Sequence, residues 1–183
     1  TIKLLGTAER STALSVYVSA CIVPSSHVLA SIGSNGNGVA VKSANMGQCC
    51  YMGPGAGRFA TANSVVADIC RMAHEAPSPA FPKPSTIATA IDHDFVHYFY
   101  VRIPCAAQIA QSGNTTGVIA KVEEIARSHG ISVATVSKDH PGNVCLTTAS
   151  ECSYSQIRQL CAAFQSESYC VGDCVFLPVG SAV

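Results

Sequence analysis

A glycine-rich turn between an expected strand and an expected helix constrains this chain more than any other feature. The strand-like run is residues 48–52, the turn is residues 53–57, and an apolar periodic stretch follows. Glycines at such a junction let backbone N–H groups approach a ligand closely, and a helix N-terminus favours negative charge. The turn is therefore a candidate phosphate-binding element, and a plain tight turn is the alternative.

The turn also fits the dinucleotide fingerprint G-x-G-x-x-G/A over residues 55–60. In a primary fingerprint, an acidic residue follows about 20 positions later, at the end of a second strand. Here residues 77–80 read Pro-Ser-Pro-Ala, which does not form a strand. The turn is thus not expected to be the main phosphate loop of a Rossmann domain.

Composition narrows the functional class. The 183 residues are enough for one ordinary domain or two small ones. Eleven basic and eleven acidic residues leave no basic excess for binding nucleic acid or an anionic membrane surface. No apolar run approaches the roughly 18 residues of a membrane helix, and no secretory signal is seen at the start. Because residues 2–5 read as a strand already under way after Thr1, we expect a fragment or a processed product.

Ten cysteines raise three alternatives: disulfides, a zinc site or reduced thiols. No C-x-x-C pair occurs, so neither zinc nor another metal site is expected. Cys70, Cys145 and Cys161 stand where an apolar residue would serve in expected helices or strands. Reduced cysteine behaves as a small buried hydrophobe. This favours a cytoplasmic protein with reduced thiols.

The first part of the chain, residues 1–57, is rich in expected strands. Residues 14–18 alternate apolar and polar side chains, and residues 32–38 form a strong turn signal. A helix is expected over residues 61–74, with Thr61 as its N-cap. Its apolar residues recur at helical spacing and predict one buried face. They are Ala62, Val65, Val66, Ile69, Met72 and Ala73.

Residues 76–94 read as a linker because four prolines there exclude a helix. Where the linker ends, four potential metal-ligating side chains cluster. They are Asp92, His93, Asp94 and His97. A metal site and a solvated loop are the alternatives, and the position after the proline run favours the solvated loop.

Residues 95–183 predict a separate unit with the order β-α-β-β-α-β. The strands are expected over residues 98–103, 131–136, 144–147 and 169–177. Asn114 or Thr115 caps the first helix and Gly130 ends it, while Ser153 and Gln156 form a capping box for the second. The apolar stripes are Val118, Val122, Ile125 and Ala126, then Ile157, Leu160, Cys161 and Phe164. This split βαβ pattern predicts a four-stranded antiparallel sheet with both helices on one face. The other face needs a cover, often a second copy.

Two sets of motifs together resemble a known family. The βαββαβ pattern, with residues 117–121 opening its first helix, looks like an ACT domain. The upstream motifs, in the same order, resemble the C-terminal half of homoserine dehydrogenase. These motifs are residues 23–30, 37–39, 51–57 and 61–68, after the strand 2–5. The resemblance covers essentially the whole chain, and the ACT-like part points to the monofunctional, threonine-sensitive type.

The resemblance implies an α+β fold in three parts. Residues 1–75 would be part of the catalytic and dimerisation region, a partial sheet with a return helix. Residues 76–94 would be the linker, and residues 95–183 a ferredoxin-like βαββαβ ACT domain for feedback regulation. The implied reaction is hydride transfer between NAD(P)H and aspartate semialdehyde, giving homoserine for threonine, methionine and isoleucine biosynthesis. A homodimer or tetramer is also implied.

The resemblance also assigns site residues. The glycine turn becomes the segment that returns to the cofactor, with Gly53, Gly55, Gly57 and Thr61 as cofactor-binding residues. The rest of that site, including the main phosphate loop, would lie outside this chain. The family's catalytic lysines and substrate-binding carboxylates lie before residues 2–5, so no catalytic residue is assigned here. His27 either faces the substrate region or is a satisfied structural histidine, and the second interpretation is favoured.

An amino-acid effector, most simply threonine, would bind where the first ACT strand meets the first helix. The implied residues are Asn114, Thr116, Gly117 and Val118. The family commonly has Asp-x-Pro-Gly there, whereas residues 114–117 read Asn-Thr-Thr-Gly. An effector ammonium group would lose a charge-assisted partner, worth about 1–2 kcal/mol more than a neutral one. The alternative hypothesis is a non-catalytic ACT module that binds an amino acid or forms dimers.

Overall fold

The structure, a computed structural model, describes residues 1–10, 13–74, 90–106, 115–139 and 142–180. Its described residues form two compact units. The first joins residues 1–24 to residues 90–180, and the second holds residues 25–74. This division differs from the segments expected in the sequence, because the first two strands pack with the C-terminal part of the chain.

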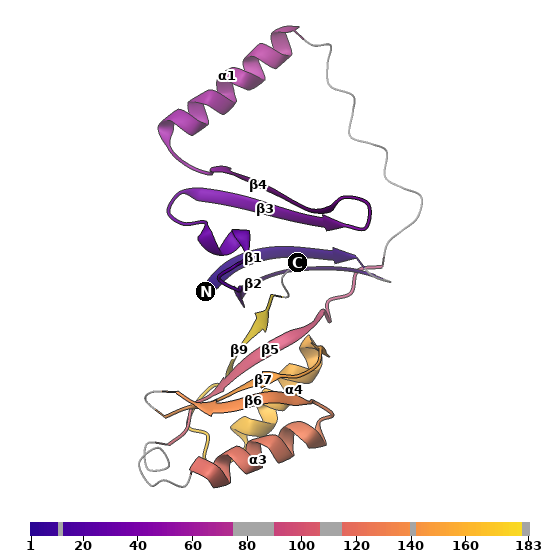
Figure 1. The fold of residues 1–183 in the computed structure, drawn as a ribbon, viewed down its shortest axis with the longest axis vertical. Helices are drawn as coiled ribbons and strands as arrows, with labels where there is room; N and C mark the ends of the chain where they lie inside the picture. Colours follow the sequence, from indigo (N-terminus) through magenta and orange to yellow (C-terminus); the bar gives the residue numbers. More distant parts are fainter. Residues whose placement is uncertain (11–12, 75–89, 107–114, 140–141, 181–183) are drawn as a thin grey trace. The chain divides into compact units, whose positions relative to one another are not determined.

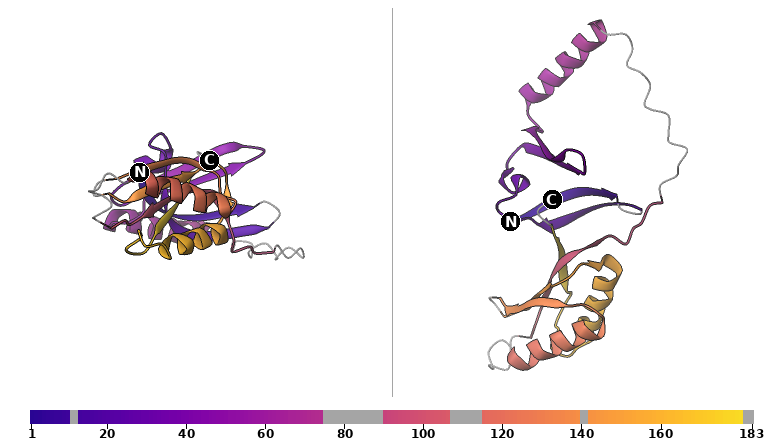
Figure 2. Two further views of the ribbon diagram at one scale, coloured as in Figure 1. Left: turned by 90° about the horizontal axis from the view of Figure 1, so that it is seen from below. Right: turned by 45° about the vertical axis from the view of Figure 1, so that its right-hand side comes forward.

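The C-terminal part of the first unit contributes four main strands to a seven-stranded sheet and carries two helices. Its elements are β5 (Val96–Ile103), α3 (Thr115–Ser128), β6 (Val133–Lys138), β7 (Val144–Thr148), the short β8 (Cys152–Ser153), α4 (Tyr154–Gln165) and β9 (Val175–Val179). The strand order is β9-β5-β7-β6, and every neighbouring pair is antiparallel. Both helices lie on one face of this sheet (Figures 1 and 2). The expected fold class, with helices and sheets mixed in one chain, is confirmed.

The core of this unit lies between that sheet face and the two helices. Its largest fully buried side chains are Phe99, Val101, Ile103, Val122, Val144, Leu146, Ile157, Leu160 and Phe164. Both predicted apolar stripes are in this core, with Ile125 only partly buried. Cys145 and Cys161 are buried as expected.

Local signals at the helix ends are also confirmed. Ser153 Oγ accepts from the N–H of Gln156 at 3.2 Å, and Gln156 Oε1 accepts from the N–H of Ser153 at 2.9 Å. Gly130 ends α3 with φ +72°. The last strand, in contrast, begins at Val175, six residues later than expected, because Tyr169 and the residues after it pair with the segment that follows β5.

The hairpin of β1 (Ile2–Arg10) and β2 (Leu14–Ile22) completes the first unit. Its strands pair antiparallel in a register that places Gly6 opposite Val18, and Ile22 pairs with Val179 of β9. One face of the hairpin exposes a row of large apolar side chains. They are Ile2, Leu4, Val16 and Val18, each more than half exposed. On the opposite face, Tyr17 stacks on Phe95 with ring centroids 3.8 Å apart.

The second unit contains the short helix η1 (Val28–Ser31), the hairpin of β3 (Gly36–Ser43) and β4 (Gly47–Pro54), and α1 (Arg58–His74). Helix α1 begins three residues earlier than expected. Thr61 is therefore not its N-cap, because the Thr61 N–H donates to the Gly57 carbonyl at 3.0 Å inside the first turn.

The prediction of a buried face on α1 is wrong for the described structure. No residue of α1 is buried, and Met72 is 81% exposed. Cys70 is likewise exposed rather than buried. The stripe is apolar as the periodicity indicates, but the described residues of this unit leave it uncovered. Figure 1 shows α1 extending beyond the β3–β4 hairpin.

Neither α1 nor any other helix in the described ranges has the length and apolar character needed to cross a membrane.

Candidate functional site

Asn35, in the loop between η1 and β3, forms hydrogen bonds with the glycine turn of the second unit. Strand β4 ends at Pro54 and α1 begins at Arg58, so three residues make the turn. The N–H of Gly55 donates to the Asn35 carbonyl at 2.7 Å, and Asn35 Nδ2 donates to the Ala56 carbonyl at 3.0 Å. The backbone of the turn is thus fixed on both sides by Asn35.

One of the three predicted glycines is restricted by its backbone conformation, and a second lies close to a neighbouring side chain. Gly57 has φ +116°, a conformation that residues with a β-carbon rarely adopt. A β-carbon on Gly55 would overlap the side-chain amide of Asn37, which would have to move. Gly53 has no such restriction, because nothing lies within 4 Å of its β-carbon position and its φ is not positive. Gly53 therefore belongs to the end of β4 rather than to the turn.

The start of α1 has the electrostatic character of an anion-binding site. The hydrogen bond from Thr61 to Gly57 is the first of the helix, which leaves the N–H groups of residues 58–60 without helical partners. The first turn contains no acidic residue, and the Arg58 guanidinium lies 4.6 Å from the centroid of the Phe59 ring. A helix N-terminus with an adjacent cation favours a phosphate group.

The expected effector residues lie at the start of α3, in the other unit. Asn114 lies outside the described residues. The N-cap position falls there as well, since α3 begins at Thr115. Thr116 and Gly117 are exposed in the first helical turn. Val118 is only 9% exposed and packs in the core, so it has only its backbone to offer a ligand.

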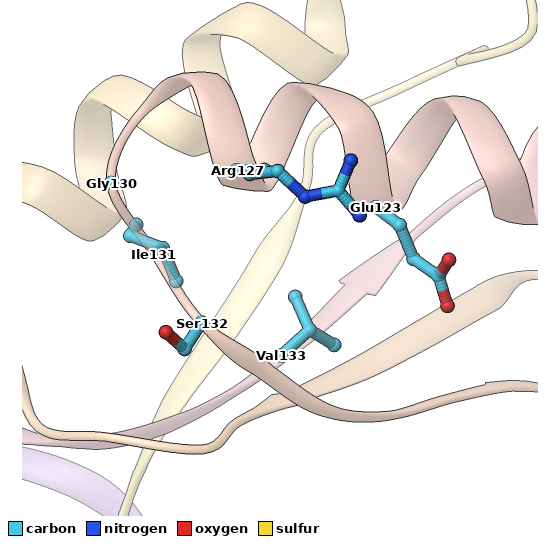
Figure 3. A pocket seen from close by; sticks show the side chains of 6 residues that line it. All are labelled: Glu123, Arg127, Gly130, Ile131, Ser132 and Val133. Atoms are coloured by element: carbon cyan, nitrogen blue, oxygen red, sulfur yellow. The ribbon is translucent and has the colours of Figure 1, made fainter.

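A surface pocket lies at the opposite end of α3. Its volume is about 500 Å³, and it is lined by Glu123 and Arg127 of α3 and by residues 130–133. The side chains of Glu123 and Arg127 lie one helical turn apart and project above Val133 (Figure 3). The sequence analysis assigned no site to this end of α3. Glu123 and Arg127 have opposite charges and are four residues apart, a spacing that places them on the same face of the helix and can be recognised in the sequence.

Two of the three histidines singled out in the sequence, His27 and His97, have structural contacts. His27 Nδ1 accepts from the N–H of Leu29 at 3.2 Å and so caps η1, and its Nε2 lies 3.1 Å from Nε2 of Gln48. The structural interpretation of His27 is confirmed. His97 is buried in β5, so the expectation of a solvated loop is wrong at this position.

His97 joins the N-terminal hairpin to β5. Its Nε2 lies 3.1 Å from Oε1 of Glu9 and 2.5 Å from the Tyr17 hydroxyl. Burial raises the pKa of Tyr17 well above its usual range. The alternation of apolar residues from Phe95 to Ile103 would have placed His97 on the buried face. No group of three or more potential metal ligands has metal-binding geometry within the described part of the chain.

Comparisons with known proteins show which family the chain is similar to. A family model described as homoserine dehydrogenase matches residues 1–70. The homoserine dehydrogenase of Neisseria gonorrhoeae (strain ATCC 700825 / FA 1090) is 32% identical over 145 residues, covering 78% of this chain and 28% of the relative. That of Lactococcus lactis subsp. lactis (strain IL1403) is 29% identical over 122 residues, covering 63% and 26%. The chain is similar to homoserine dehydrogenases, and its residues 1–70 match the model of that family.

The fold of the chain is also similar to solved structures. A homoserine dehydrogenase from Thiobacillus denitrificans matches with a TM-score of 0.82 at 23% identity, over 100% of this chain and 43% of that one. The S. aureus enzyme at pH 8.5 matches with a TM-score of 0.60 at 18% identity, over 98% and 41%. The chain spans about a quarter of the length of the two curated relatives.

Proposed function

We propose that this chain is part of an NAD(P)-dependent oxidoreductase that interconverts aspartate semialdehyde and homoserine in threonine, methionine and isoleucine biosynthesis. The observation that carries the proposal is the glycine turn at residues 55–57. It lies within the segment matched by the family model, and Gly57 in it has a positive φ that favours glycine. The backbone N–H groups of the first turn of α1 come directly after this glycine turn in the chain.

In this proposal the chain contributes one side of the cofactor site. Gly55 and Gly57 let the backbone approach the cofactor closely, the free N–H groups of α1 face its phosphate charge, and Thr61 lies one turn further on. Gly53 positions the end of β4. The cofactor supplies the hydride when bound, and the remaining binding groups and the catalytic lysines lie outside this chain. We therefore expect no turnover from this polypeptide alone.

A chimaeric enzyme tests the cofactor assignment. This chain would replace the matching segment of the Neisseria gonorrhoeae relative, and KM for NADPH would be measured for Gly57→Val. We expect KM to rise about tenfold, because relief of about 1–3 kcal/mol of strain at a position with positive φ would move the N–H groups of the first turn away from the cofactor. Gly33→Ala is the matched control, since nothing lies within 4 Å of its β-carbon position. Equal KM values for both variants would contradict the proposal.

A second proposed function belongs to the βαββαβ part of the first unit. Its strand order and its single helix-covered face support an ACT-type module that binds threonine or another amino acid. The effector contacts would be Asn114, Thr116, Gly117 and the backbone of Val118. Its uncovered sheet face supports association of the chain as a homodimer or tetramer.

Calorimetric titration of the chain with threonine tests this second function. We expect binding in the micromolar to millimolar range, weakened by Thr116→Ala and unchanged by Arg127→Ala in the distant pocket. A flat trace would contradict an effector role and leave a purely structural module. If Arg127→Ala weakened threonine binding and Thr116→Ala did not, the binding site would be the pocket beside β6.

The same proposal places the enzyme in the cytoplasm. All ten cysteines are free thiols in the structure. Free thiols in this number are typical of a reducing compartment.

A further inference from the structure

Four thiols of the first unit lie close together beside β5 and α4. Cys105 follows β5, Cys161 lies in α4, and Cys170 and Cys174 lie between α4 and β9. Cys174 is within hydrogen-bonding reach of both Cys161 and Cys170. These sulfurs do not form a metal-binding arrangement among the described residues. Their proximity therefore points to chemistry between thiols.

The backbone places Cys105 and Cys170 directly opposite each other. They form an antiparallel bridge. The N–H of Ala106 donates to the Tyr169 carbonyl at 3.1 Å, and the N–H of Val171 donates to the Pro104 carbonyl at 2.9 Å. Because these bonds flank the two cysteines, the pair is of the non-hydrogen-bonded type, with Cα atoms about 4.5 Å apart and side chains on the same face. That separation is within the range of about 4.4–6.8 Å found in disulfides.

We propose that Cys105 and Cys170 form a reversible cross-strand disulfide by exchange with a small-molecule disulfide such as oxidised glutathione. The Cys170 thiolate attacks one sulfur of glutathione disulfide, forming a mixed disulfide and releasing one glutathione thiolate. The Cys105 thiolate then attacks the Cys170 sulfur and releases the second. The two protein thiols lose two protons and two electrons, and glutathione disulfide is reduced to two glutathione thiols, which take up the protons.

Cys170 is the better first nucleophile because its sulfur lies at the surface, where it donates to the Gly172 carbonyl at 3.2 Å. Cys105 donates to the Ile103 carbonyl at 3.5 Å from a more buried position. Burial raises the pKa of both thiols. The exchange is therefore slow near neutral pH and becomes faster as the pH rises, because only the thiolate attacks.

The disulfide would tie the end of β5, where the chain leaves toward α3, to the loop that leads into β9. The closed loop would contain α3, β6, β7 and α4. A cross-link over so long a segment restricts the unfolded chain. The oxidised form would thus have a more stable βαββαβ unit, and the redox state of the cell would set that stability independently of the proposed dehydrogenase activity.

The test is to incubate the chain with oxidised glutathione and to map its peptides without reduction. We expect one peptide pair joined through Cys105 and Cys170, about 2 Da lighter than the sum of the two reduced peptides because two thiol hydrogens leave. Tm should rise by roughly 10 °C, and dithiothreitol should reverse both changes. Cys105→Ser should abolish the joined peptide pair and the Tm shift, whereas Cys50→Ser, a change at an exposed cysteine of the other unit, should leave both unchanged.

Two outcomes would overturn the proposal. One is a cross-link between Cys170 and Cys174 only. The other is retention of the Cys105 and Cys170 thiols under conditions that convert Cys50 to a mixed disulfide with glutathione. Mapping the unmodified sequence gives this answer directly, so it does not depend on whether a serine variant folds.

Discussion

Gly57 has the most restrictive backbone conformation of the candidate site, with φ +116° at the junction of the turn and α1. The Thr61 N–H donates to its carbonyl, so a strained residue here would loosen the first turn of the helix. The conformation of Gly57 therefore positions the backbone N–H groups at the start of α1 that could bind a ligand.

Gly57→Ala should destabilise the start of α1 by about 1–2 kcal/mol, because alanine is strained at positive φ. Hydrogen exchange at the Thr61 amide is the measurement, and it should become roughly tenfold faster. Gly33→Ala should leave the same amide unchanged. If Thr61 exchanged equally in both variants, the turn would not depend on the conformation of Gly57.

Asp94 gives the first unit a pH-dependent contribution to stability. Partial burial acts to raise its pKa, but hydrogen bonds from the Ser155 hydroxyl at 2.7 Å and the Ser155 N–H at 2.6 Å outweigh it and hold the pKa below its usual range. A carboxyl with a lowered folded-state pKa stabilises the fold above its unfolded pKa of about 4 and loses that contribution as the pH falls further.

We therefore expect Asp94→Asn to flatten the loss of stability below about pH 4. Urea unfolding at several pH values between about 5 and 2 would measure it. Ser155→Ala should flatten the same region less, because the backbone N–H bond remains. An unaltered acid limb in Asp94→Asn would show that these hydrogen bonds do not act on the carboxyl.

At the scale of elements, α4 and α1 have similar apolar periodicity but different surroundings. Every predicted stripe residue of α4 is buried, whereas no residue of α1 is. Ile157→Ala should cost about 2–5 kcal/mol of unfolding free energy and Ile69→Ala less than about 0.5 kcal/mol. Urea denaturation of the two variants compares the same side-chain change in both settings. Comparable losses would mean that α1 has a cover in solution.

Sequence reasoning was most successful where the signal was local. The capping box at Ser153 and the glycine at position 130 mark helix ends through contacts within a few residues. Periodicity identified the helical face of α1, but whether a face is buried depends on distant parts of a chain. The sequence predicted the start of α1 at Thr61, whereas the helix begins at Arg58, directly after Gly57.

Long-range pairing explains the other errors. The strand expected from Tyr169 begins at Val175 because residues 169–171 bond instead to the segment after β5. His97 was read as part of a loop because its partners, Glu9 and Tyr17, lie some 80 residues earlier in the chain. For the candidate site, the sequence located the glycine turn but not the role of Asn35 in fixing it.

At the scale of the whole molecule, two compact units carry different proposed roles. The second unit holds the glycine turn and the first turn of α1. The first unit combines the β1–β2 hairpin, which lies in the segment matched by the family model, with the βαββαβ sheet. The cluster of Glu9, Tyr17 and His97 joins these two parts of the first unit. Cofactor contact and effector response are thus assigned to separate parts of the chain.

NADPH oxidation in the presence of aspartate semialdehyde tests the central claim most directly. The rate should be measured for this chain alone and for the chimaera in which it completes the Neisseria gonorrhoeae relative. The account predicts turnover by the chimaera and none by the chain alone. Turnover by the chain alone, or a folded chimaera that binds NADPH without reducing aspartate semialdehyde, would contradict it.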